Sequence, residues 1–393
     1  MHDHLSVTIG AVSLAYYFHQ TSSSEVLAEA RREYIRALQL TNAALRSSEL
    51  ALKDTTLLAT LLLDLFEKFT SPILRDSWKT HVHGALALVK LRGTKQYSDP
   101  IGLRMVMRLS INILISFVAC NSALPRDFIA VRTFTADFLK TLDPKWKLTD
   151  LMVDYAAFRA RLIAGQLSEL ETISIATKLD ARYLNLMNTM PPSWRYETVN
   201  LSSTSSGVFG DHFHVYPSQH VTQTWNVIRT IRIFLNDTIR ETCLSFDDSL
   251  LPQDYTQVSN AATECIENLA LDICASAPQY LVDLDLIRAR LKAVKCIKYP
   301  ETSQNSISRP QYETSVAYLK CYTLLFPLYV AAQYTLATST RDWILKQLHH
   351  MSSKYCFKNA HRVAEILERE DEDAEVRNPW RVYIMLGSYA FAA

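Results

Sequence analysis

The sequence is poor in the residues on which tight turns and phosphate-binding loops depend. It has 8 glycines and 13 prolines among its 393 residues. This scarcity argues against a sheet fold with many turns and against a doubly wound nucleotide-binding fold. Helices need few glycines, and hydrophobic residues make up 48% of the chain, which is enough to bury a large core. The composition therefore favours an all-α fold.

Excess charge of either sign is also missing. The 41 Lys and Arg residues balance 40 Asp and Glu residues, so nothing indicates the basic face that a nucleic-acid backbone attracts. The longest apolar run, Ile111 to Cys120, is shorter than the roughly 20 residues that cross a bilayer. The first residues do not resemble a secretory signal. We expect an intracellular protein, cytoplasmic or nuclear, with no direct nucleic-acid binding and no membrane contact.

The cysteines form no metal-binding pattern. They are widely spaced and include no C-x-x-C pair, which is typical of buried free thiols in a reducing compartment. The aspartate-rich motifs of class I terpene synthases are incomplete at Asn236-Asp237 and at Asp247-Asp248. We therefore expect no cofactor and no bound metal. The seven cysteines are at positions 120, 243, 265, 274, 296, 321 and 356.

Helical periodicity dominates the chain. We expect one all-α domain over residues 1–393, built as a multi-helix bundle or curved array of antiparallel helix pairs. The alternative division has two lobes, 1–195 and 212–393. A mobile loop at 197–211, where the residues are small and polar, separates them. Periodicity predicts helices at 25–50, 54–69, 77–92, 101–121, 127–141, 148–170, 173–189, 217–241, 254–276, 282–295, 311–336, 340–351, 356–370 and 378–391.

Two of these helices carry an unusual pattern. An aspartate, Asp54, opens a leucine-rich helix that ends near Glu67, and the next helix contains Trp78, His81, Gly84-Ala85 and Arg92-Gly93. We expect His81 to be buried and hydrogen-bonded beneath a packed Trp78. We expect Arg92 to bind a carboxylate or helix end, and Gly84 to allow close approach of another helix.

This pattern resembles the C-terminal regulatory domain of fungal zinc-cluster transcription factors, known as the fungal-specific transcription factor domain. The resemblance implies an all-α regulatory domain. The cysteine-rich DNA-binding module of such factors is missing from the sequence, so we do not expect this chain to bind DNA by itself. The chain is then a solo regulatory domain, the product of a truncated gene sequence, or the same scaffold put to another use. Weaker similarities are found at Tyr34, Ala37-Leu38, Pro192 to Tyr196, Tyr216, Trp225-Asn226, Arg229, Phe326 to Ala331 and Arg341 to Ile344.

The best candidate for chemistry is the run from Asp211 to Tyr216. In extended backbone His212 and His214 point the same way, as an acid–base pair or two metal ligands would. Asp211, His212, His214 and Tyr216 are therefore the candidate catalytic donors. The alternative is a polar loop that returns to the core, and the short motif alone favours that alternative.

Two functions remain open from the sequence. In the first, the chain is a transcription-factor-like regulator that holds a small hydrophobic ligand, a protein partner or a second copy of itself, in fungal regulation or secondary metabolism. In the second, the same scaffold is a cofactor-free biosynthetic enzyme of fungal polyketide or terpenoid metabolism. Such an enzyme would be a cyclase or isomerase, or a pericyclase of the Diels–Alder type, and would act by holding its substrate near the reactive geometry.

Overall fold

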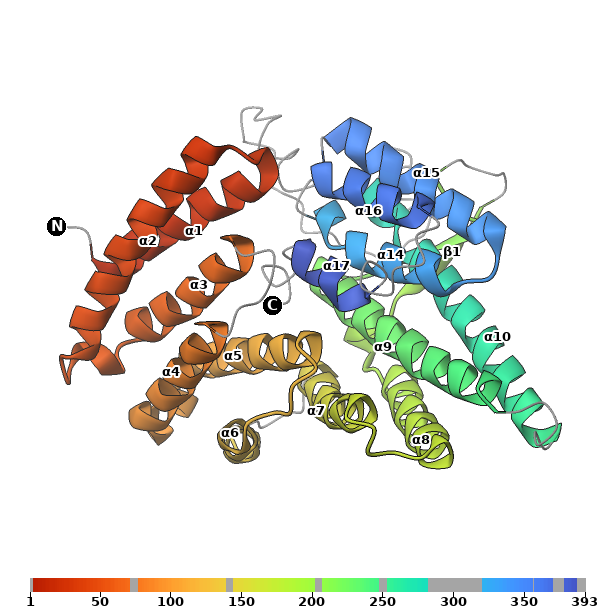
Figure 1. The fold of residues 1–393 in the computed structure, drawn as a ribbon, viewed down its shortest axis with the longest axis horizontal. Helices are drawn as coiled ribbons and strands as arrows, with labels where there is room; N and C mark the ends of the chain where they lie inside the picture. Colours follow the sequence, from red (N-terminus) through yellow and green to blue (C-terminus); the bar gives the residue numbers. More distant parts are fainter. Residues whose placement is uncertain are drawn as a thin grey trace. The chain divides into compact units, whose positions relative to one another are not determined.

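In the computed structural model, helices dominate. The structure describes residues 3–70, 77–138, 144–201, 207–246, 253–281, 320–355, 357–369 and 378–386. Within these ranges one two-stranded hairpin accompanies the helices (Figure 1), so the predicted all-α fold is confirmed. The expected helix at 282–295 and the first part of the one at 311–336 lie outside the described residues.

The contacts of the chain separate two compact units, one of residues 1–164 with 380–393 and one of residues 165–379. These limits differ from those of the predicted lobes because helix α8 (Glu169–Asn188) packs along α9 (Gln219–Leu244) and so belongs to the second unit. That the chain is one domain stays a prediction.

The first unit begins with a helix that periodicity did not predict. Helix α1 has no Asp, Glu, Lys or Arg, and its start is set by Asp3, whose carboxylate accepts a hydrogen bond from the backbone N–H of Ser6 at 2.7 Å. It lies beside α2, and α3 packs on both (Figure 1). The unit contains α1 (His4–Thr21), α2 (Ser24–Leu45), α3 (Asp54–Thr70), α4 (Ser77–Arg92), α5 (Pro100–Ala119), α6 (Arg126–Ala136), α7 (Pro144–Ile163) and nearly all of α17 (Pro379–Met385), with short 3-10 turns at Leu50–Leu52 and Thr94–Ser98.

Small residues allow the close contact of α1 with α2. Ala11 and Ala15 on α1 meet Ala30 on α2 in a fully buried cluster, which Phe66 and Phe69 of α3 cover. An alanine on each side lets the two helix backbones approach more closely than larger side chains would allow. This cluster is one of two buried clusters that join the first three helices, and the other consists of Val7, Ala37 and Leu63.

Helix α5 corrects one expectation. Although arginines interrupt its apolar run, its 20 residues are long and apolar enough to cross a membrane by length and composition. Within that window 67% of the residues are buried inside the fold, as in the core helix of a soluble protein. The absence of membrane contact stays a prediction.

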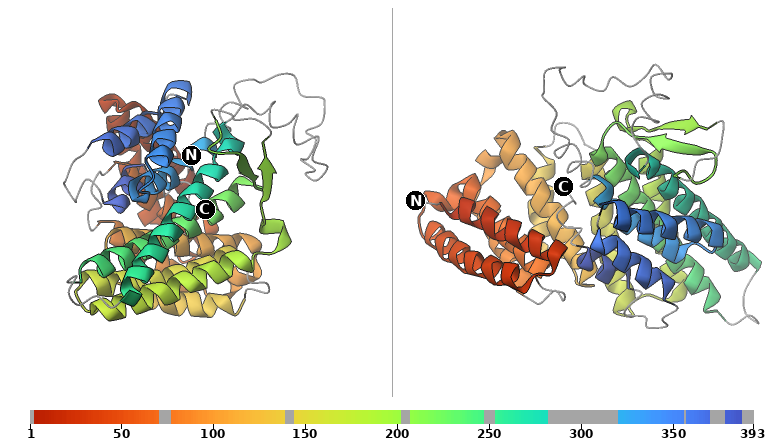
Figure 2. Two further views of the ribbon diagram at one scale, coloured as in Figure 1. Left: turned by 90° about the vertical axis from the view of Figure 1, so that its right-hand side faces the viewer. Right: turned by 90° about the horizontal axis from the view of Figure 1, so that it is seen from above.

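The second unit packs its helices against one another and carries the hairpin at its edge (Figure 2). Helix α8 starts with a reciprocal capping box between Ser168 and Glu171. Strand β1 (Glu197–Asn200) occupies part of the segment expected to be a loop, and residues 202–206 of that segment lie outside the described residues. The other elements are β2 (His212–Val215), α9 (Gln219–Leu244), α10 (Gln253–Ser276), α11 (Pro278–Leu281), α14 (Leu325–Tyr334), α15 (Thr338–Tyr355), α16 (Lys358–Glu368) and a 3-10 turn at Pro192–Trp194.

Candidate functional site

The hairpin places the candidate residues on two different faces. Its strands are antiparallel, with Thr198 opposite His214 and Asn200 opposite His212. Strand alternation puts these four on one polar face, while Val199 and Phe213 pack into an apolar cluster on the other. The prediction that His212 and His214 point the same way is confirmed, and their ring centroids lie 5.8 Å apart. The apolar face fixes the register that brings the two histidines together.

Tyr216 follows β2 and is anchored on both its backbone groups. The side-chain oxygen of Gln279, on α11, accepts a hydrogen bond from the Tyr216 N–H at 2.9 Å, and its amide donates to the Tyr216 carbonyl at 3.0 Å. The hairpin contacts α10 and α11 within this unit (Figure 2). Because both backbone groups are bound, the Tyr216 side chain has a fixed direction into the core.

The Tyr216 hydroxyl meets a fully buried arginine. Nη1 of Arg229, on α9, donates to this hydroxyl at 2.6 Å and to Oδ1 of Asn226 at 3.0 Å. Nε of Arg229 lies 3.4 Å from a carboxylate oxygen of Asp272, on α10, whose side chain is 32% exposed. The carboxylate balances the buried guanidinium, which keeps its charge at any physiological pH.

Three aromatic rings surround this guanidinium. The central carbon of Arg229 lies 5.4 Å from the ring centroids of Tyr196 and Trp225 and 5.8 Å from that of Tyr216. Cation–π attraction of this kind replaces part of the hydration that a buried cation loses. The indole N–H of Trp225 donates to the carbonyl of Trp194 at 2.7 Å, which holds the turn before β1 against α9. The rings therefore join the hairpin to the helices of the unit.

His214 lies beside this cluster and is itself buried. Its ring packs against Tyr196 at a tilt of 30°, with ring centroids 4.0 Å apart, and its Nδ1 lies 3.3 Å from the Tyr216 hydroxyl. Burial lowers the pKa of His214 to about 3, and the charges of Arg229 and His212 act in the same direction. His214 is therefore neutral at pH 7 and acts as a hydrogen-bonding group there.

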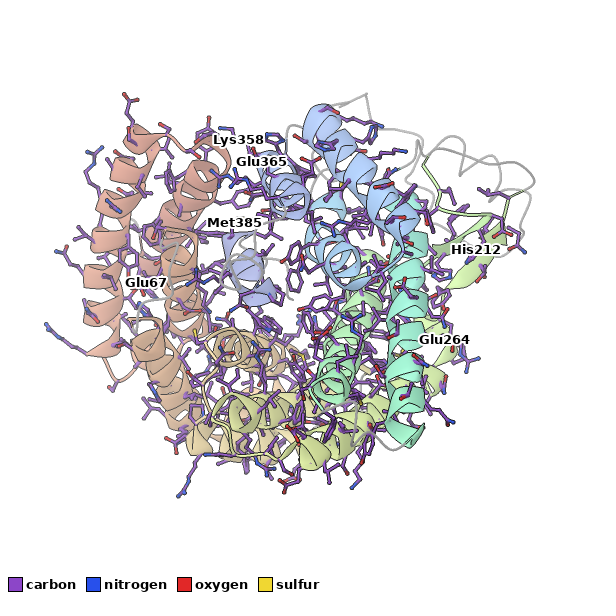
Figure 3. All side chains as sticks on the ribbon, turned by 45° about the vertical axis from the view of Figure 1, so that its right-hand side comes forward. Glu67, His212, Glu264, Lys358, Glu365 and Met385 are labelled. Atoms are coloured by element: carbon purple, nitrogen blue, oxygen red, sulfur yellow. The ribbon has the colours of Figure 1, made fainter. Side chains whose placement is uncertain are left out.

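Asp211 and His212 form the exposed end of the site. Nδ1 of His212 lies 3.0 Å from Oδ1 of Asp211, and the two side chains are 43% and 89% exposed. This hydrogen bond lowers the pKa of Asp211. Figure 3 places the labelled His212 at the outer edge of the second unit.

The four candidate donors thus divide into an exposed pair, Asp211 with His212, and a buried pair, His214 with Tyr216. Their catalytic role stays a prediction. In the described part of the chain no three His, Cys, Asp or Glu side chains gather closely enough to hold a metal ion.

Sequence reasoning noted Arg229 as part of the resemblance and missed its role. A charged residue among the isoleucines of α9 is the signal that indicates a buried partner. Asp272 and Gln279 carry no such signal because they are ordinary polar residues far along the chain.

The Trp78–Gly93 pattern of the first unit serves packing. The Tyr34 hydroxyl donates to Oε1 of Glu67 at 2.5 Å, and Nε2 of His81 lies 3.0 Å from the same oxygen. One carboxylate oxygen therefore joins α2, α3 and α4, and Glu67 is labelled on α3 in Figure 3. Arg92 forms an ion pair with Asp54 at the start of α3. The expected hydrogen bonding of His81 and the carboxylate partner of Arg92 are both confirmed, while the side chain of Trp78 lies outside the described residues.

The expectation for Gly84 is wrong among the described residues. A Cβ placed on Gly84 meets no atom within 4 Å, and the residue is exposed on α4. Close approach of another described helix is therefore not the reason for a glycine there.

A second buried cation lies in the first unit and was not predicted. Lys68, on α3, donates to Oδ2 of Asp64 at 2.6 Å and, at 2.8 Å each, to the side-chain oxygens of Asn112 and Ser116 on α5. Burial lowers the pKa of Lys68, and Asp64 opposes this. The network fastens α3 to α5 through charge and hydrogen bonds.

Comparison with known proteins agrees with the pattern in the first unit. Residues 1–136 match the family model described as the fungal-specific transcription factor domain. No curated protein and no solved structure matches the chain. The resemblance is confirmed for 136 of the 393 residues, which include all the residues of the Trp78–Gly93 pattern. This part of the chain is similar to a regulatory domain of fungal transcription factors.

Proposed function

We propose that the chain is a regulatory domain of the fungal transcription factor type, which changes transcription when it holds a small hydrophobic molecule. The observation that carries this proposal is the family match over residues 1–136. The pattern residues of that region support it, because Glu67 and His81 are used to join helices and Arg92 pairs with Asp54. We expect the protein in the nucleus or the cytoplasm.

The alternative occupant is a protein partner or a second copy of the chain. A regulator of this kind would modulate transcription by pairing with a factor that itself binds DNA. Light scattering of the purified chain separates monomer from homodimer, and native mass spectrometry of the same sample detects a retained small molecule. A retained small molecule on a monomer favours the proposal.

The direct test tethers the full chain to an unrelated DNA-binding domain upstream of a reporter gene in a fungal cell. We expect reporter output to differ from that of the DNA-binding domain alone. Equal output from the two, at equal protein levels and over several growth conditions, would overturn the regulatory proposal.

An enzymatic function is the second candidate, and the neutral His214 beside the Arg229-bound Tyr216 favours it. Such groups polarise a carbonyl without a cofactor. In this hypothesis the chain is a cyclase or isomerase, or a pericyclase of the Diels–Alder type, and Asp211 and His212 complete the set of donors. The test incubates the purified protein with the linear precursor from its own gene neighbourhood. Product formation no faster than in buffer argues against catalysis.

A further inference from the structure

The hydrogen bonds of the second unit determine which nitrogen of His214 carries its proton. A guanidinium only donates, so the Tyr216 oxygen accepts from Arg229. The single O–H of Tyr216 then needs an acceptor, and Nδ1 of His214 is the acceptor within reach, at 3.3 Å. A neutral imidazole that accepts at Nδ1 carries its proton on Nε2. Arg229 therefore donates a hydrogen bond to Tyr216, and Tyr216 donates one to His214.

We propose that Arg229 and Tyr216 hold His214 in this form so that its Nε2–H binds the carbonyl oxygen of a small apolar molecule. Nε2 has no hydrogen-bond partner among the described residues, and the residue itself is 3% exposed. The N–H is thus a donor without an acceptor, on the polar face of the hairpin. The inference rests on the proposed function in that it takes the effector to be a small molecule.

The surroundings of His214 favour a carbonyl compound with an apolar body. The Tyr196 ring lies against His214 and is half-buried, so it offers an aromatic face beside the donor. Across the strand pair, Thr198 and Asn200 are exposed and add polar groups to the same face. The carboxylate of Asp211, next to His212, makes this end of the hairpin unfavourable for an anionic ligand.

His214 also keeps this donor over a wide range of pH. A histidine of ordinary pKa gains a second proton near pH 6 and becomes a cation. The pKa of about 3 leaves the imidazole neutral throughout that range. Neutral imidazole is a suitable donor to a carbonyl oxygen because it does not transfer a full proton in the ground state.

The first experiment measures the tautomer. Long-range proton–nitrogen correlation spectra of the full chain, labelled at histidine, distinguish protonated from unprotonated ring nitrogens. We expect His214 to show an unprotonated Nδ1 and a protonated Nε2. Y216F removes the donor to Nδ1 and should give a mixture of the two tautomers. Y183F makes the same change in α8 and should leave the His214 signals as in the wild type. A protonated Nδ1 in the wild type would overturn the inference.

The second experiment titrates acetophenone, an apolar ketone, while the His214 ring signals are followed. For a ligand of this size we expect a dissociation constant on the order of millimolar. H214N keeps an acceptor for Tyr216, and its amide N–H groups do not reach the position of Nε2 because the asparagine side chain is shorter. It should therefore lose the saturable shift of neighbouring signals, whereas H361N on α16 should retain it. No saturation in the wild type, or equal binding by H214N, would overturn the ligand class. The reporter assay is independent of both spectra, so a failure of the regulatory proposal is distinguishable from a failure of this site.

Discussion

Acid should destabilise the second unit through His214, and the size of the effect follows from its burial. The pKa of about 3 in the folded chain lies below the value near 6.5 for an unfolded histidine. Between these values the unfolded chain binds more protons, so stability is fully present above the unfolded pKa and is lost as pH falls toward the folded pKa. Between pH 7 and pH 5 this difference amounts to about 2 kcal/mol of unfolding free energy.

The variant that isolates this effect is H214N. The asparagine side-chain oxygen can replace Nδ1 as the acceptor for Tyr216 and does not titrate. Urea unfolding of both proteins at pH 5 and pH 7, followed by the fluorescence of Trp194 and Trp225, gives the two free energies. We expect the wild type to lose about 2 kcal/mol more than H214N over this range. Subtracting one pH dependence from the other removes the contribution of the titrating groups that the two proteins share.

A matched control replaces an exposed histidine of the same unit. His361 lies on the outer face of α16, and H361N should follow the wild-type pH dependence. Hydrogen exchange at the backbone amides of β2 and α9 reports the same loss locally. If H214N and the wild type lose equal stability between pH 7 and pH 5, His214 is not held neutral by burial and the reasoning is refuted.

Three further predictions concern Lys68, Tyr34 and Asp237. K68M leaves the carboxylate of Asp64 buried without its cation, so we expect a loss of about 3–5 kcal/mol in chemical unfolding, which the double variant with D64L should largely restore. Y34F removes the hydroxyl bound to Glu67 and should cost about 1–2 kcal/mol by the same measurement, whereas a loss under 0.5 kcal/mol would contradict the hydrogen bond. Burial raises the pKa of Asp237 to about 6, above its unfolded value, so stability present in acid is lost as pH rises. Relative to D237N, the wild type should lose about 2 kcal/mol between pH 4 and pH 7, and parallel pH curves would contradict this.

Local patterns in the sequence were enough to predict most helices and the direction of two side chains. The period of the apolar residues indicates helices such as α9 and α10, and alternation places His212 and His214 on one face of β2. Helix α1 was not predicted because it has no charged residue to mark a polar face. Strand β1 was not predicted because its four residues, beside a Ser- and Thr-rich stretch, are too few to show an alternating pattern of polar and apolar residues.

The contacts that complete the site join residues that are far apart in the sequence. Gln279 binds the backbone of Tyr216 from 63 residues away, and Asp272 reaches Arg229 from another helix. Lys68 meets Asn112 across 44 residues. The residues that neighbour each of these positions in the sequence do not indicate such partners, because ordinary polar residues acquire these roles only when helices pack.

Two of the buried cations, Lys68 in the first unit and Arg229 in the second, differ in how completely their partners are fixed. Lys68 donates to three oxygens at 2.6–2.8 Å, including a carboxylate that is itself buried, so its partners are fixed by packing. Arg229 pairs at 3.4 Å with Asp272, whose side chain is partly exposed, and its Nη2 has no hydrogen bond among the described residues. A cation with an incomplete set of partners gains more when a neighbouring group rearranges. The network around Lys68 therefore holds α3 and α5 together, whereas Arg229 joins α9 to Tyr216 and to α10 through contacts that leave one of its nitrogens without a hydrogen bond among the described residues.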